Sequence, residues 1–95
     1  MNTPQSCVRL QAWFEGRVQG VGFRYHAAKI AREYEIVGHV ENLPDGRVHL
    51  LIEGREDQAE AFLSQVCDDL GHFIKKTQVD SQKIDKPQCK GFALR

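Results

Sequence analysis

Apolar and polar residues alternate in some parts of this chain and follow a helical spacing in others. Strict alternation over residues 8–15 predicts a half-buried strand. Residues 36–43 and 48–53 are predicted to form two more strands, and a weaker alternation over residues 73–84 predicts another. The apolar positions within residues 92–94 indicate a short last strand.

Two segments have helical spacing instead. Apolar side chains at positions 23, 27, 30, 31 and 34 form one stripe, and a second stripe runs from Ala59 to Leu70. Glu56 and Asp57 favour the start of the second helix because acidic groups interact well with the positive end of the helix dipole. Gly71 is predicted to be the C-terminal cap of this helix.

The segment Leu43-Pro44-Asp45-Gly46 favours a hairpin turn between two of the strands. The order of elements is then β-α-β-β-α-β with an extra C-terminal strand. This order predicts an α+β fold, the ferredoxin-like split β-α-β sandwich, with an antiparallel sheet of four to five strands and two helices on one face. We expect one domain over residues 8–95, after an N-terminal lead-in at residues 1–7.

Composition and charge exclude several classes of protein. The chain of 95 residues has 13 basic and 13 acidic side chains, and this balance argues against a dedicated nucleic-acid binder. No apolar run approaches the roughly 20 residues of a membrane span, and the first residues do not resemble a signal peptide. Cys7, Cys67 and Cys89 are predicted to be reduced thiols of a cytoplasmic protein, with their pairing left open.

The glycine-rich segment of residues 16–24 carries the strongest signal for chemistry. Its N–H groups can converge on an anion, and the start of the following helix adds unpaired N–H groups. Arg24 lies in the first turn of that helix, where a cation is unfavourable unless an anion binds nearby. The spacing fits neither a nucleotide P-loop nor a dinucleotide fingerprint. A plain glycine-rich turn with an exposed arginine is the alternative.

The run Gly-Arg-Val-Gln-Gly-Val-Gly-Phe-Arg at residues 16–24 resembles the first signature of the acylphosphatases. The second signature of that family resembles residues 38–42, Gly-His-Val-Glu-Asn, followed by Gly46, Val48 and Gly54. His39 and Glu41 depart from the family pattern, which has an aromatic residue and a basic or neutral residue at these places. In a regular strand their side chains point away from those of residues 40 and 42, so they leave the assignment of Asn42 intact.

The resemblance implies metal-free hydrolysis of a carboxyl-phosphate anhydride to a carboxylate and inorganic phosphate, with no cofactor. By motif position, Arg24 would hold the phosphate and Asn42 would orient the attacking water. The backbone of the loop would bind phosphate through residues Val18, Gln19, Gly20, Val21, Gly22 and Phe23. The implied partner is a small-molecule acyl phosphate, without nucleic acid or membrane, and the protein is expected to be a monomer.

Two non-enzymatic alternatives share these features. An RNA-recognition module has the same element order, but residues 47–53 carry no aromatic side chain on which a base could stack. A small anion sensor, or another ferredoxin-like binding module, would use the same loop without turnover. The histidines at positions 26, 39, 49 and 72 lack metal-site spacing in the sequence and are expected to have no metal role. Trp13 is either packed on the sheet or part of the substrate site.

Overall fold

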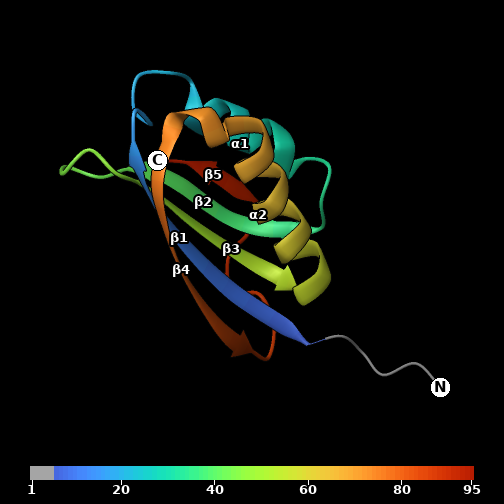
Figure 1. Ribbon diagram of the computed structural model, residues 1–95. Helices are drawn as coiled ribbons and strands as arrows, with labels where there is room; N and C mark the ends of the chain where they lie inside the picture. The colour runs from blue at the N-terminus through green and yellow to red at the C-terminus, as the bar shows by residue number, and fades with distance from the viewer. Residues whose placement is uncertain (1–5) are drawn as a thin grey trace.

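Two helices cover one face of a five-stranded sheet in the computed structural model, which describes residues 6–95 (Figure 1). The strands are β1 (Cys7–Gly16), β2 (Ile36–Asn42), β3 (Val48–Arg55), β4 (Ile74–Ile84) and β5 (Phe92–Leu94). The helices are α1 (Phe23–Ala31), α2 (Glu56–Leu70) and the short 3-10 helix η1 (Gly71–Phe73). Most of the predicted lead-in, residues 1–5, lies outside the described residues, and Cys7 already belongs to β1.

The strand order is β4-β1-β3-β2-β5, which confirms the predicted ferredoxin-like α+β class. The prediction of a wholly antiparallel sheet is wrong, because β5 pairs with β2 in parallel. After β4, on one edge, the chain crosses to the opposite edge on the face away from the helices. Glu53 holds this crossing, since its Oε1 accepts hydrogen bonds of 2.8 Å from the backbone N–H groups of Gln88 and Cys89. The last strand thereby covers the edge of β2 that would otherwise be unpaired.

The core lies between the sheet and the two helices. Every second residue of β1 is buried, from Val8 to Phe14, and the stripe of α2 at Ala59, Phe62 and Val66 packs against the same face. A buried phenylalanine such as Phe62, which is 0% exposed, contributes about 3–5 kcal/mol relative to alanine. The helical stripes predicted from the sequence are therefore the core-facing sides of α1 and α2.

The predicted helix ends need two corrections. Tyr34 lies beyond the end of α1, although its ring still packs edge-on against Phe62 at a centroid distance of 6.0 Å. Gly71 does end α2, but with a φ of −56° it keeps the right-handed helical conformation, and the chain continues into η1. Glycine at that position is therefore not required by a left-handed cap.

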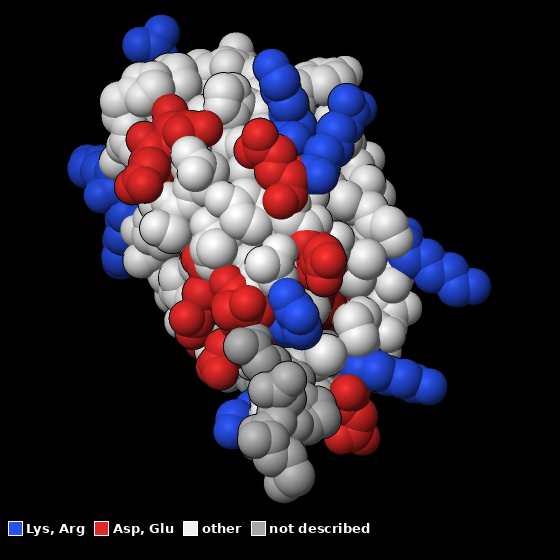
Figure 2. Space-filling model, turned by 90° about the vertical axis from the view of Figure 1, so that its right-hand side faces the viewer, with Lys and Arg blue, Asp and Glu red and all other residues white. Residues whose placement is uncertain are grey.

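Several smaller expectations concern the surface and the thiols. β4 is an edge strand with Lys75 and Lys76 exposed on it, charges that discourage pairing with another chain. Cys7, Cys67 and Cys89 are free thiols, and burial raises the pKa of the last two. Among residues 6–95, no helix is both long and apolar enough to span a bilayer. Acidic and basic side chains are mixed on the side of the molecule that lies to the right in Figure 1, as Figure 2 shows.

Candidate active site

The loop between β1 and α1 is shaped by glycines that adopt left-handed backbone angles. Gly20 has a φ of 77° and Gly22 a φ of 80°. A Cβ atom at either position would meet no other atom within 4 Å, so the backbone conformation and not the space requires glycine. The N–H of Arg17 donates a 2.9 Å hydrogen bond to the carbonyl of Phe73, which anchors the start of the loop.

The first turn of α1, which Gly22 precedes, has neither a side-chain cap nor an acidic residue. The first helical hydrogen bond runs from the N–H of His26 to the carbonyl of Gly22 at 3.0 Å. The N–H groups before His26 therefore have no carbonyl partner within the helix, and they carry the positive end of its dipole. Such a turn binds phosphate well.

Arg24 is held by the C-terminal segment. One terminal nitrogen of its guanidinium, Nη1, donates a hydrogen bond to the main-chain oxygen of Arg95. The N–H of Arg95 in turn donates to the carbonyl of Val40 at 2.8 Å. Arg24 is thus tied to β2 through the residue that follows β5. This contact fixes one side of the guanidinium and leaves its other donors for a ligand.

Asn42 is the last residue of β2, next to the hairpin turn. Gln19 ties that turn to the glycine-rich loop, because its Nε2 donates hydrogen bonds of 2.9 Å to the carbonyls of Leu43 and of Arg47. Asp45 stabilises the turn itself by accepting from the Arg47 N–H at 3.0 Å, and this bond lowers the pKa of Asp45. The sequence placed Gln19 among the loop residues but gave no sign of the role of its side chain.

The loop, the start of α1 and the end of β2 enclose a hollow of about 180 Å³. Six of the eight residues predicted for the site line it: Val18, Gly20, Gly22, Phe23, Arg24 and Asn42. Gln19 and Val21 are not among the lining residues. Tyr25, which was not predicted as a site residue, completes the wall with a largely exposed ring.

The two departures from the family pattern lie away from this hollow. Val40 is buried toward the helices, so His39 and Glu41 point to the other face of the sheet, as predicted from strand geometry. Trp13 is also on that other face, where its ring stacks on His49 at a centroid distance of 5.0 Å. Trp13 borders a separate small hollow rather than the one lined by Arg24.

Comparison with known proteins identifies the family. The family model named Acylphosphatase matches residues 10–94. The chain belongs to the acylphosphatase family. An acylphosphatase from Methanospirillum hungatei JF-1 is 45% identical over 86 residues, which cover 90% of this chain and 91% of the relative. An acylphosphatase from Archaeoglobus fulgidus is 49% identical over 59 residues, or 62% of this chain.

The match to some of these acylphosphatases covers only part of their length. The chain spans 66% of the Archaeoglobus fulgidus relative and 56% of one from Nocardia farcinica. Among solved structures, the acylphosphatase from Bacillus subtilis has a TM-score of 0.81 at 28% identity, with 93% of this chain and 98% of that chain covered. All of this chain also matches 12% of full-length HypF, with a TM-score of 0.82 at 28% identity.

Proposed function

We propose that the chain is an acylphosphatase, which hydrolyses the carboxyl-phosphate bond of acyl phosphates. The observation that carries this proposal is the shared hollow, in which Arg24, Asn42 and the start of α1 meet. A guanidinium and a set of N–H groups are suited to the equatorial oxygens of a transferring phosphoryl group. Family membership over residues 10–94 supports the same activity.

The reaction needs positioning and charge stabilisation more than acid catalysis. Arg24 and the N–H groups of the loop hold the phosphate, and Asn42, a neutral donor and acceptor, orients a water molecule for in-line attack on phosphorus. The bond from phosphorus to the water oxygen forms as the bond to the carboxyl oxygen breaks. The carboxylate leaves with the bonding electron pair, and the proton from water passes to a phosphate oxygen.

The proposed substrate is a small acyl phosphate in free solution. A hollow of this size can take up a phosphate group without a protein, nucleic-acid or membrane partner. We also propose that the protein works as a monomer in the cytoplasm. Its free thiols fit a reducing compartment, and its zero formal net charge does not favour nucleic acid.

The test is an assay of benzoyl phosphate hydrolysis, in which both the loss of the acyl phosphate and the release of inorganic phosphate are measured. We expect turnover that inorganic phosphate inhibits competitively. Turnover should be unchanged by EDTA, because no His, Cys, Asp or Glu is among the described residues that line the hollow. Phosphate binding without hydrolysis would instead support the anion sensor. Loss of hydrolysis with EDTA, restored by a divalent ion, would overturn the metal-free mechanism.

A further inference from the structure

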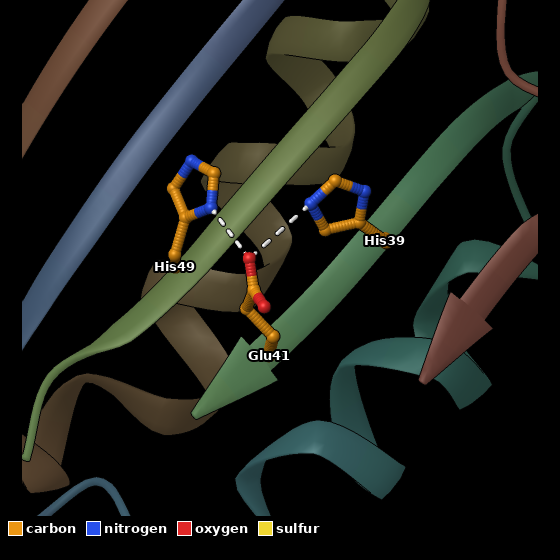
Figure 3. A group of neighbouring side chains, drawn as sticks. All are labelled: His39, Glu41 and His49. Atoms are coloured by element: carbon orange, nitrogen blue, oxygen red, sulfur yellow. Dashed lines mark hydrogen bonds and ion pairs between the residues drawn. The ribbon is translucent and has the colours of Figure 1, made fainter. Parts of the chain in front are cut away.

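A group of three potential metal ligands lies on the face of the sheet opposite the helices. His39 and Glu41 come from β2 and His49 from β3, and their side chains point toward one another (Figure 3). Glu41 is the cross-strand partner of His49, and His39 lies two residues before Glu41, on the same side of β2. The register of the hairpin therefore brings together three residues that no local sequence motif connects.

The distances suit a single small ion. Glu41 Oε1 lies 3.4 Å from His49 Nδ1 and 3.7 Å from His39 Nε2, and all three ligand atoms lie within 4.8 Å of one another. Two ligands that are each about 2.1 Å from a tetrahedral Zn²⁺ are roughly 3.4 Å apart. Small rotations of the imidazole rings would complete this geometry.

His39 has a buried nitrogen without a hydrogen-bond partner. The residue is 8% exposed, and among the described residues its Nε2 is the buried side-chain polar atom that makes no hydrogen bond. Burial, followed by repulsion from Arg95, lowers the pKa of His39. A buried polar atom without a partner is costly, and a neutral imidazole nitrogen is a metal ligand. A metal ion would supply the missing partner.

His49 is oriented as a metal ligand by its neighbours. Its Nε2 lies 2.9 Å from Gln11 Oε1, which can only accept, so Nε2 carries the hydrogen. Nδ1 lies 3.4 Å from Glu41 Oε1, a contact that a proton on Nδ1 would make a hydrogen bond, and a metal ion bound by both atoms would take the place of that proton. The bond from Nε2 to Gln11 is the second contact that metal-binding histidines usually have.

We propose that His39 Nε2, Glu41 Oε1 and His49 Nδ1 form a binding site for one divalent transition-metal ion of the Zn²⁺ type. Two of the three donors are imidazoles, which favour such an ion over Mg²⁺ or Ca²⁺. The side chain of Glu41 is 33% exposed, so water can reach the site and complete the coordination. The nearby negative charge of Glu53 favours a bound cation, and the positive charge of Arg95 disfavours it.

This site is separate from the proposed phosphate site. Glu41 and Asn42 are neighbours on β2, but their side chains lie on opposite faces of the sheet. The metal proposal therefore does not depend on hydrolysis.

The experiment is a titration of untagged, reduced protein with Co²⁺, monitored by visible absorption and by calorimetry, followed by displacement with Zn²⁺. We expect one ion per chain and d–d bands without a thiolate charge-transfer band. Glu41→Gln and His49→Gln should each weaken Co²⁺ binding at least about tenfold. Gln11→Leu, which removes the bond that orients His49, should weaken Co²⁺ binding by about tenfold. Melting temperatures of the metal-free variants should stay near that of the parent.

His26→Gln is the matched control. His26 Nε2 also lies 3.4 Å from a carboxylate oxygen, Asp69 Oδ2, but this pair is more exposed and belongs to no three-ligand group among the described residues. Its removal should leave Co²⁺ affinity unchanged. The proposal is overturned if folded protein binds no Co²⁺ at millimolar concentration, if Glu41→Gln binds as tightly as the parent, or if the spectrum shows thiolate ligands.

Discussion

Arg24 and Asn42 reach the same hollow from different elements, and they differ in charge. The guanidinium is a fixed cation in a helix turn that disfavours cations by about 0.3–1 kcal/mol, so its placement there is best explained by an anionic ligand. The amide of Asn42 adds hydrogen-bonding capacity without charge. In the proposed mechanism this division separates phosphate binding from water positioning, and substitutions can test each role alone.

Replacement of Arg24 tests whether the planar fork matters in addition to the charge. We expect Arg24→Lys to be nearly as damaging as Arg24→Ala, because lysine keeps the charge but cannot donate in parallel to two oxygens. Each variant should lose about 10²–10³ in kcat/KM, by analogy with the loss of other preorganised donors. Steady-state hydrolysis of benzoyl phosphate measures this. Near-parental kcat/KM in the lysine variant would show that Arg24 acts through its charge alone.

Asn42 is tested by two substitutions with different expected effects. Asn42→Ala should lower kcat and kcat/KM together and leave the inhibition constant for inorganic phosphate almost unchanged. Asn42→Asp adds a negative charge beside the phosphate, so it should weaken phosphate binding as well, more strongly at low salt. Both variants must melt near the parent for the comparison to count. Parental turnover in both would show that Asn42 does not position the water.

Among the elements, α1 and the loop before it form the proposed phosphate site. Gly22 turns the chain into the helix at a φ of 80°, and the unpaired N–H groups follow immediately. Gly71, at the end of α2, has an ordinary helical φ of −56°. Neither glycine has an atom within 4 Å of an added Cβ, so the two positions differ in backbone conformation alone.

Alanine at these two glycines should therefore have opposite effects. Gly22→Ala should lower the free energy of unfolding by about 1–2 kcal/mol and weaken phosphate binding, because alanine disfavours the left-handed conformation. Gly71→Ala should raise that free energy by about 0.4–1 kcal/mol, since it restricts the unfolded chain without straining the folded one. Urea unfolding measures both. A destabilised Gly71→Ala would contradict the conformational explanation.

The sequence predicts the larger elements well, because their apolar spacing reflects burial against one core. It also places Arg24 and Asn42, through two motifs of fixed spacing. It does not predict the parallel pairing of β5, since a strand of three residues carries no signal for its partner. The approach of His39 to His49 was missed for a related reason. This approach depends on the register between β2 and β3, which could have been predicted from the hairpin turn at residues 43–46.

For the whole molecule, Glu53 connects the centre of the sheet to the crossing chain. The residue is 1% exposed; Arg9 binds its Oε2 through Nε and Nη2, each at 2.7 Å, and Gln88 and Cys89 donate to its Oε1. Burial by itself raises the pKa of this carboxyl group. The N–H groups of Cys89 and Gln88, with the side chains of Cys89 and Arg9, outweigh burial and lower the pKa to about 2.

This lowered pKa predicts a loss of stability in acid. The ordinary pKa is 4.5, so the ionised group contributes fully above about pH 4.5, and its contribution disappears as the pH falls toward 2. We expect the melting temperature to fall over that window. Glu53→Gln should lower the melting temperature at pH 7 and flatten its pH dependence in acid. An equally steep acid dependence in this variant would assign the effect to other carboxyl groups.

The contact between Arg24 and the residue after β5 also bears on the order in which the molecule folds. Trp13 lies in β1, between β3 and β4, whereas the guanidinium of Arg24 is held only once the last residues of the chain have reached β2. β5 has three residues and makes few contacts to offset the entropy lost when it reaches β2, so its docking is expected to come late in folding. During refolding from urea, Trp13 fluorescence should recover before hydrolysis does. Each newly folded molecule would then pass through a stage in which the other four strands are paired, β5 is not yet docked and the site is inactive.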